Sequence, residues 1–528
     1  MTRAPGRLDW TIALILVVGF GALYGATSAP SVLFSDAGEL QTVAALGGVA
    51  HPPGYPTFVM IGQFVARWLP VEPARRITWM AVTFGALGVG GLALLVRRLG
   101  ASRAAATGAA ILFGGTFTYW WSAIGAEVYN LAVVMFLFAL WRVTVALETR
   151  SARDGILAAL LLGLTATGHL AFGPALLVLG VALVMHAPEG APPAGFAIVL
   201  LGAFTLGLTP YLYVLVADHS GLPMNYLRSI LEPAGHQFGI DPRTFSNPWV
   251  RLGYMFTGRE ATNLYTLHPR ELLANAADAL AIEGLFELGP IAAALALFGA
   301  VRLARRRDAI AFALLGAGAA TLMFATVSAW ARLRPVFLMP CTVVLSIAVG
   351  FGLDGTTARA RGPGWARAAG IAALVGVAAL APHLLRLRAI ARPIGPLGWH
   401  MRVKDGPMPA GPLPSFAGDW SARRYGEAVL RGIPPGALVV GRWYEITVLE
   451  YLLLAEGQRP DLTLEPYDGS HRVRLERWQD RHDLKRRPFV LLTRLPGLAA
   501  AFADADSIVV APGQTLLVKR TRITAPTY

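Results

Sequence analysis

Long apolar segments with few or no charged residues recur along most of this chain, and they limit the possible folds more than any other feature. A helix that spans a membrane needs about 20 apolar residues. The segments that meet or approach this length are residues 10–29, 77–96, 104–119, 131–147, 171–186, 195–216, 288–303, 309–327, 336–353 and 368–385. Residues 155–167 form a shorter run, counted as a separate helix because 155–186 as a single helix would be about 48 Å long. The pattern predicts an all-α polytopic membrane domain with about eleven spans.

The charge content of the chain changes near residue 393. Only 15% of the 528 residues are charged, whereas average soluble domains carry roughly 25%, and the deficit lies before that point. We therefore predict a membrane domain at residues 1–388 and a small α/β soluble domain at residues 389–528. The elements expected in the second domain are helices at 414–432, 445–456 and 497–502, and strands at 437–440, 462–464, 489–492, 508–510 and 514–519.

The arginines gather in alternate connections between the apolar segments. Basic residues favour cytoplasmic loops, and the clusters at residues 3–7, 97–103, 150–153, 302–307 and 359–367 fit a cytoplasmic N-terminus. With an odd number of spans, the C-terminal domain then lies on the extracytoplasmic side. The net charge of +14 comes from these short loops, so we predict membrane lipids and no nucleic acid as partners. The arginine, alanine and glycine content suits a GC-rich bacterium, and hence a bacterial inner membrane.

The first extracytoplasmic connection, residues 30–76, carries the most unusual sequence. Asp36 and Glu39 stand three residues apart shortly after the first span, and His51-Pro52-Pro53 follows. On a helix that spacing places both carboxylates on one face, which suits acid–base chemistry. The same spacing also fits a helix capping box, with the His-Pro-Pro sequence as a rigid turn. The residues alone leave both alternatives open.

The pair of motifs Asp36-Ala37-Gly38-Glu39 and His51-Pro52-Pro53-Gly54-Tyr55-Pro56 resembles the opening of a family of bacterial and animal multispanning proteins. This family is related to the protein O-mannosyltransferases and falls in the GT-C superfamily of membrane glycosyltransferases. The sequence departs from the family near residues 225–237, and its soluble tail lacks the helical repeats of the animal relatives. Weaker matches lie at residues 126–129, 168–170, 332–335, 430–437 and 456–461.

The resemblance implies a GT-C fold and an inverting, mannosyltransferase-like transfer from a polyprenyl-phosphate-linked sugar to a protein or glycolipid hydroxyl. It makes Asp36 the candidate general base, with Glu39 orienting the acceptor or sharing the proton. His51 would contact the phosphate or the sugar of the donor. Pro52 and Tyr55 complete the predicted donor-binding turn.

Further donor-binding candidates lie beside other spans. Glu127 precedes the fourth span, and the resemblance includes it in the site. His169 lies in an apolar hairpin, where a lone histidine is more often structural than functional. Arg332 and Arg334 lie outside against the charge bias, which suits pairing with a lipid phosphate, although snorkelling to the interface explains them equally.

No compact set of metal ligands is evident, so we predict that no metal or other cofactor is required. Some members of the superfamily use a divalent metal, which keeps metal dependence an open question. The single cysteine, Cys341, excludes an internal disulfide. A transporter or flippase of lipid-linked sugars is the main alternative function, and an assembly factor that works through its soluble domain is another. Sugar transfer from a labelled donor separates the three.

Overall fold

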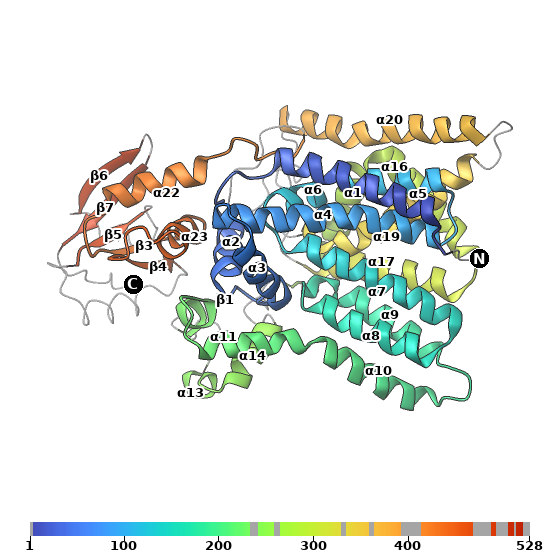
Figure 1. Ribbon diagram of the computed structural model, residues 1–528, viewed down its shortest axis with the longest axis horizontal. Coiled ribbons are helices and arrows are strands. Elements are labelled where there is room, and N and C mark those ends of the chain that lie inside the picture. The colour runs from blue at the N-terminus through green and yellow to red at the C-terminus, as the bar shows by residue number, and fades with distance from the viewer. Residues whose placement is uncertain are drawn as a thin grey trace. The chain divides into compact units, whose positions relative to one another are not determined.

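The computed structural model describes residues 4–232, 241–257, 265–328, 334–357, 364–391, 413–467, 487–492, 505–511 and 514–520. Within it the chain forms two compact units (Figure 1). The first unit comprises Met1–Ser28, Trp79–Tyr211 and Ala261–Phe416. The second unit comprises Ala29–Thr78, Leu212–Glu260 and Ala417–Tyr528. The predicted division at residues 388 and 389 stays a prediction.

The first unit is built from helices, several of which run side by side (Figure 1). Among them α16 packs along α19, α7 along α8, and α9 along α17. Its helices are α1 (Arg7–Thr27), α4 (Pro73–Arg98, from Trp79 on), α5 (Arg103–Gly114), α6 (Phe117–Ile124), α7 (Tyr129–Thr149), α8 (Ala152–Ala166), α9 (Gly173–Met185), α10 (Pro193–Gly207), α15 (Pro269–Ala281), α16 (Gly289–Ala304), α17 (Ala309–Val327), α18 (Arg334–Phe337), α19 (Met339–Thr357) and α20 (Gly364–Ala391).

Many of these helices are long and apolar enough to cross a membrane. In the described residues 7 helices meet that standard, and the count rises to 8 if the bent pair Pro269–Glu287 and Gly289–Ala304 forms one span. Each of the eleven predicted segments contains a helix, but α5, α8 and α9 are shorter than a full span. The prediction of a polytopic membrane protein is confirmed, whereas the number eleven stays a prediction.

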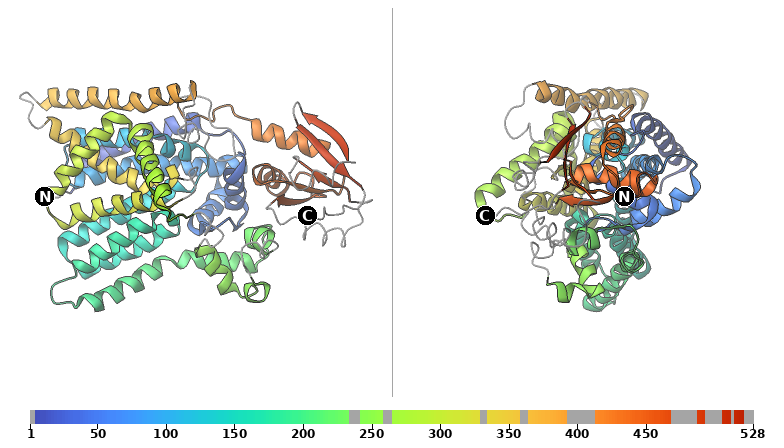
Figure 2. Two further views of the ribbon diagram at one scale, coloured as in Figure 1. Left: turned by 180° about the vertical axis from the view of Figure 1, so that it is seen from behind. Right: turned by 90° about the vertical axis from the view of Figure 1, so that its left-hand side faces the viewer.

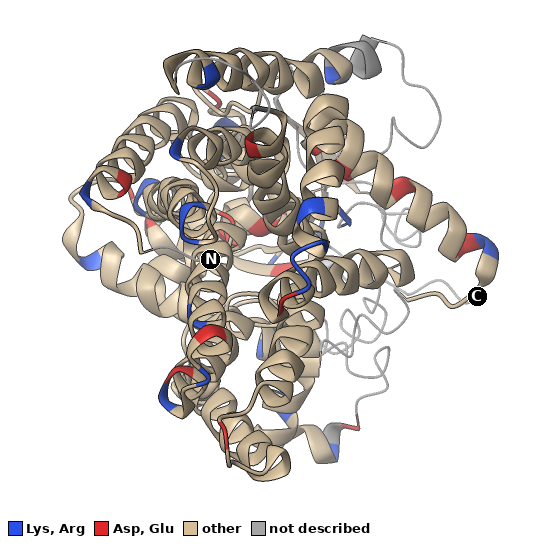
Figure 3. Ribbon diagram, turned by 90° about the vertical axis from the view of Figure 1, so that its right-hand side faces the viewer, with Lys and Arg blue, Asp and Glu red and all other residues tan. Residues whose placement is uncertain are grey.

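Most of the ribbon in Figure 3 belongs to uncharged residues, which are drawn in tan. Asp9, near the start of α1, illustrates how charges in this unit are compensated. Its carboxylate accepts hydrogen bonds from Arg97 at 3.1 Å and from Arg103 at 2.8 Å. These arginines belong to one of the predicted cytoplasmic clusters, and they also fasten α1 to the α4–α5 corner.

The second unit combines short helices with a five-stranded sheet, which Figure 2 shows from two further sides. The strand order is β4-β3-β5-β7-β6. Strand β3 pairs in parallel with β4 and β5, whereas β7 is antiparallel to both β5 and β6. The strands are β3 (Leu438–Arg442), β4 (Thr463–Tyr467), β5 (Phe489–Leu491), β6 (Asp506–Ala511) and β7 (Gln514–Lys519).

The helices of the second unit come from three parts of the chain. They are α2 (Ser35–Leu46), α3 (Pro56–Trp68), α11 (Leu212–His219), α13 (Pro242–Phe245), α14 (Pro248–Thr257), α22 (Ser421–Gly432) and α23 (Trp443–Glu450). A two-residue strand, β1 (Gly48–Val49), pairs in parallel with β2 (Met224–Asn225). The predicted small α/β region is confirmed, including the hairpin at its end. The predicted helix at 497–502 lies outside the described residues.

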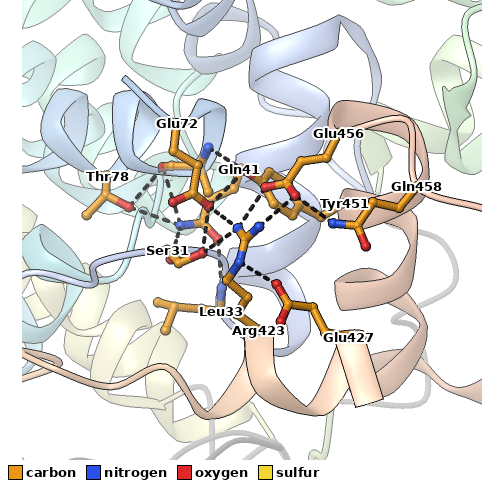
Figure 4. Close-up of polar contacts among 11 residues, drawn as sticks. Ser31, Leu33, Gln41, Glu72, Thr78, Arg423, Glu427, Tyr451, Glu456 and Gln458 are labelled. Atoms are coloured by element: carbon orange, nitrogen blue, oxygen red, sulfur yellow. Dashed lines mark hydrogen bonds and ion pairs between the residues drawn. The ribbon is translucent and has the colours of Figure 1, made fainter. Parts of the chain in front are cut away.

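The core of the α/β region extends into the first connection of the chain. Val32 and Ala74 are buried in the same apolar cluster as residues of β3, α22 and α23. A polar cluster lies beside this core and is drawn in Figure 4. In it Arg423 contacts Glu72 at 3.0 Å and Glu456 at 2.7 Å. Residues 29–78 therefore fold as part of the same unit as the C-terminal sheet.

Candidate active site

Helix α2 presents the two carboxylates of the first motif, but it does not use them as caps. The helix begins after Phe34, and no side-chain cap hydrogen bond is formed there. Asp36 lies in the first turn, and Glu39 follows one turn later on the buried part of the helix. The capping-box alternative is therefore wrong, because both side chains bind other partners.

The imidazole of His51 is held by Glu39. The Oε1 atom of Glu39 accepts the backbone N–H of His51 at 2.8 Å, and Oε2 bonds to Nδ1 of the ring. Glu39 is only 1% exposed, so its carboxylate is committed to this histidine. Nε2 of His51 lies 3.0 Å from the hydroxyl of Tyr55. Both ring nitrogens are thus engaged, which fixes the orientation of the ring.

Asp36 approaches the same histidine from the first turn of α2. Its Oδ2 atom lies 3.6 Å from Nε2 of His51. The indole N–H of Trp443 donates to Oδ1 at 2.9 Å. The Asp36 side chain is 13% exposed, and that of His51 is 19% exposed. Of the two acids, Asp36 is therefore the one that keeps some access to the surface.

The His-Pro-Pro turn brings His51 and Tyr55 together. The backbone N–H of Gly54 donates to the carbonyl of His51 at 2.8 Å, and the Pro52-Pro53 peptide bond is cis. Tyr55 adopts the left-handed conformation, φ 43°, as the residue that precedes α3. Its hydroxyl also lies 3.5 Å from the carbonyl of Pro52. The turn thus places its aromatic residue against the histidine ring.

The strand pair β1–β2 brings Tyr226 beside the histidine. Gly48 has φ 140°, and a Cβ atom there would lie 2.0 Å from the carbonyl oxygen of Met224. Only glycine allows this approach of the two backbones. The ring of Tyr226 then lies 6.3 Å from that of His51 and 5.7 Å from that of Trp443. We call Asp36, Glu39, His51, Tyr55, Tyr226 and Trp443 the His51 cluster.

Another acid lies near this cluster. Burial, with Glu39 and Glu465 nearby, raises the pKa of Glu450 to about 8. Its Oε2 atom is buried and has no hydrogen-bond partner within the described part of the chain. Glu450 therefore holds its proton at neutral pH, since burial disfavours the charged form.

Two predicted donor-binding residues lie in the first unit. Glu127 is 3% exposed and lies between α6 and α7. His169 precedes the short 3₁₀ helix Leu170–Phe172, and its Nδ1 atom accepts the backbone N–H of Ala171 at 3.0 Å. Its ring lies 4.9 Å from that of Tyr129 and 6.2 Å from that of Phe337. His169 thus has a clear local role, and its donor contact stays a prediction.

Arg334 is enclosed by acceptors of the protein. It donates from Nη2 to Asn275 at 2.7 Å and to the carbonyl of Ser328 at 3.0 Å, and from Nε to the carbonyl of Ala325 at 3.3 Å. Nη1 bonds to Asp278. The guanidinium is 2% exposed, which differs from a side chain that reaches the membrane interface. We call these five residues the Arg334 network. Arg332 lies outside the described residues.

Part of the chain is similar in sequence to known protein O-mannosyl-transferases. Residues 36–189 match the model of the protein O-mannosyl-transferase TMEM260 N-terminal domain. The chain is 30% identical to the protein O-mannosyl-transferase TMEM260 of Mus musculus over 221 residues, which is 40% of this chain and 31% of the mouse protein. It is 40% identical to the Dictyostelium discoideum protein of that name over 82 residues, which is 15% of this chain and 10% of that one.

The predicted resemblance is confirmed. The match to the TMEM260 N-terminal domain contains Asp36, Glu39, His51 and Tyr55, so the motifs that suggested the family lie inside it. The chain spans less than a third of the length of these curated relatives. Among solved structures, ArnT from Cupriavidus metallidurans is 13% identical to this chain, and the match covers 96% of this chain and 98% of ArnT. The TM-score is 0.48 for ArnT bound to undecaprenyl phosphate and 0.47 for ArnT in the apo state.

Sequence reasoning missed the residues that lie beyond the TMEM260-like segment. Trp443 and Tyr226 belong to parts of the chain for which no site residue was predicted. A weak signal for Trp443 was present, because it lies between the predicted strand at 437–440 and the predicted helix at 445–456, and strand-to-helix turns often carry functional side chains in α/β sheets. Tyr226 lies in the segment that departs from the family. Within the described residues, no group of three or more His, Cys, Asp or Glu is arranged to hold a metal ion.

Proposed function

We propose that this protein is a membrane glycosyltransferase of the mannosyltransferase type, which transfers a sugar from a polyprenyl-phosphate donor to an acceptor hydroxyl. The observation that carries the proposal is the arrangement of Asp36 in the His51 cluster. One carboxylate oxygen is held by an indole N–H at 2.9 Å, and the other lies 3.6 Å from an imidazole nitrogen. A held carboxylate with some surface access suits a general base.

The reaction requires one proton transfer and one displacement. Asp36 takes the proton of the acceptor hydroxyl, and the acceptor oxygen forms a bond to the anomeric carbon. The bond between that carbon and the phosphate oxygen breaks, and the polyprenyl phosphate leaves with the electron pair. Attack on the face opposite the leaving group inverts the anomeric centre. A general base of this kind contributes about 10²–10⁴-fold in rate.

His51 and Glu39 have separate roles in the proposed reaction. Because Glu39 bonds to Nδ1, its charge favours the imidazolium form of His51. A cationic ring stabilises negative charge that develops on a leaving phosphate. Glu39 is then a positioning residue for His51, and Tyr55 fixes the other side of the ring. Pro52 shapes the turn that presents His51 to the donor.

The reaction belongs on the extracytoplasmic face of what we propose is a bacterial inner membrane. The support is the distribution of arginines, which favours a cytoplasmic N-terminus. The acceptor is the hydroxyl of a protein serine or threonine, as the names of the relatives suggest, or that of a glycolipid.

The test uses sealed vesicles that contain the full-length protein, synthetic polyprenyl-phosphate [³H]mannose and a water-soluble serine/threonine-rich peptide. We expect the peptide to be labelled only when it is added to the extracytoplasmic side. Asp36→Asn keeps the shape of the side chain and its contact with Trp443 but removes most of its basicity. We expect labelling to fall by about 10²–10⁴-fold while donor binding stays close to that of the wild type.

Asp419→Asn provides the matched control, because Asp419 lies in the same unit and its Oδ1 atom accepts the backbone N–H of Ser421, the first residue of α22, at 2.9 Å. Asparagine caps a helix about as well as aspartate, so this variant should keep full activity. Unchanged labelling by well-folded Asp36→Asn protein would remove Asp36 from the mechanism. Labelling only from the cytoplasmic side would overturn the proposed orientation.

A transporter or flippase remains the second candidate, and one structural feature favours it. The pair Pro269–Glu287 and Gly289–Ala304 bends by 111°, and Glu287 at this bend pairs with Arg386 at 3.3 Å. Broken helices with buried charges are common in transporters. The same vesicles separate the two functions, because a flippase moves labelled donor between leaflets without labelling the peptide.

A further inference from the structure

Trp443 joins the C-terminal sheet to the candidate base. It is the first residue of α23 and directly follows the last residue of β3. Its indole N–H donates to Oδ1 of Asp36 at 2.9 Å, across 407 residues of sequence. The indole ring also lies 6.5 Å from the ring of His51. Trp443 therefore contacts the cluster through both its polar and its aromatic part.

The place of Trp443 in the sheet is one where α/β folds position functional residues. Strand β3 pairs in parallel with β4 on one side and with β5 on the other. The chain runs from β3 through α23 to β4, and later returns to the opposite side of β3 with β5. The carboxyl end of such a strand is a topological switch point, the usual place for ligands in these sheets.

The contact is supported by close packing of α2 against α23. A Cβ atom at Gly38 would lie 2.4 Å from the carbonyl oxygen of Leu33 and 3.3 Å from Oγ1 of Thr447. The absence of a side chain at this position, two residues after Asp36, lets α2 approach α23. In the same unit, Arg423 forms ion pairs with Glu72 and Glu456, which Figure 4 shows.

We propose that Trp443 is a positioning residue for Asp36, and that the C-terminal domain thereby completes the active site. The proposal rests on the function proposed above. The indole N–H fixes Oδ1, so that Oδ2 is presented to the acceptor hydroxyl. A hydrogen bond to the charged form of a carboxylate favours that form, which keeps Asp36 ionised and ready to accept a proton. Trp443 lies outside the residues 36–189 that match the family model.

The experiment compares full-length Trp443→Phe protein with the wild type, using polyprenyl-phosphate [³H]mannose and the same peptide from pH 5 to pH 9. Phenylalanine keeps an aromatic ring but has no N–H. We expect kcat to fall about tenfold to a hundredfold, because a misplaced catalytic group loses rate of that order. The acidic limb of the pH profile should move up by about one pH unit, with donor KM within about twofold of the wild type.

Two further variants make the result specific. Trp443→His restores a ring N–H and should recover part of the rate and of the pH limb. Trp420→Phe is the matched control, since Trp420 lies in the same domain, is 40% exposed and should leave both quantities unchanged. In the Asp36→Asn background, Trp443→Phe should add little further loss, because the carboxylate through which it acts is already gone.

Several outcomes would overturn the proposal. A wild-type rate and pH limb in Trp443→Phe would do so, and the proposed function would still stand if Asp36→Asn were inactive. An equal loss of rate from Trp443→Phe with and without Asp36→Asn would also do so. If Trp443→Phe does not fold, Trp443→His decides: a loss of rate as great as that of Asp36→Asn would overturn the proposal, because a variant that restores a ring N–H should keep part of the rate. Full activity of Asp36→Asn would instead remove the proposed function.

Discussion

The His51 cluster and the Arg334 network both hold charged groups mostly away from water, but the exposure of those groups differs. In the Arg334 network one guanidinium donates to four acceptors and is 2% exposed. In the His51 cluster the Asp36 carboxylate is 13% exposed, and its Oδ2 atom lies 3.6 Å from the nearest imidazole nitrogen. The first arrangement suits stability, whereas the second keeps a carboxylate within reach of the surface.

The difference also separates two kinds of predicted residue. Asp36, Glu39 and His51 were predicted together and lie together. Arg334 was predicted to bind a lipid phosphate, but its donors face Asp278, Asn275 and two carbonyls of the same unit. The predictions below test this contrast, in order of decreasing expected effect.

Arg334→Ala should produce the largest loss of stability. It removes the cationic partner of Asp278 inside the first unit, and breaking a buried pair in this way costs about 3–5 kcal/mol. The measurement is the thermal unfolding of purified protein in detergent. Arg334→Lys should recover only part of the loss, because lysine lacks the planar fork of donors.

Arg305→Ala is the control for this variant, since Arg305 is exposed at the end of α16 and should unfold like the wild type. Normal stability together with weaker donor binding in Arg334→Ala would contradict a purely structural role for the Arg334 network. In that case the predicted phosphate role would be correct.

In contrast to Arg334→Ala, the variant Glu39→Gln should lose activity with a smaller change in stability. Glutamine keeps an acceptor for the backbone N–H of His51 but removes the charge beside Nδ1. We expect a loss of about tenfold to a hundredfold in kcat, which is less than that for Asp36→Asn. Peptide labelling with polyprenyl-phosphate [³H]mannose measures it.

Glu232→Gln serves as the matched control for Glu39→Gln. Its carboxylate is 60% exposed, so neutralising it should leave activity unchanged. Equal activity of Glu39→Gln and wild-type protein would show that the charge on Glu39 has no part in positioning His51.

Glu450→Gln should give the smallest effect, visible only as a change in pH dependence. The pKa of Glu450 is about 8 in the folded protein and 4.5 for an ordinary glutamate. The folded state therefore keeps a proton that the unfolded chain loses, and raising the pH from 5 to 9 favours unfolding. The melting temperature of the wild type should therefore fall over this range by more than that of the variant. Parallel pH curves for the two proteins would contradict the raised pKa.

Much of this architecture could be predicted from residue patterns. The apolar segments predicted the helices of the first unit, since a spanning helix has a characteristic length and composition. Alternating patterns predicted the strands and the final hairpin of the C-terminal region, because each is a local property of the sequence. The spacing of Asp36 and Glu39 predicted that both acids belong to one helix face.

The remaining features depend on contacts between distant parts of the chain. Nothing near Asp36 in the sequence indicates that Trp443 binds its carboxylate. The same holds for Tyr226, which reaches His51 through a strand pair of only two residues each. Arg334 shows a second limit of sequence reasoning. An arginine on the side where basic residues are rare can pair with an acid of the protein, here Asp278, as well as with a lipid phosphate.

The separation of Asp36 from Trp443 by 407 residues also sets an order of events during biosynthesis. Chains emerge from the ribosome N-terminal end first. The base is therefore made and inserted long before the residue that positions it. A nascent or truncated chain can carry the whole first motif and still lack an assembled site. Under the function proposed above, sugar transfer requires that the segment containing Trp443 has folded against α2, which carries Asp36.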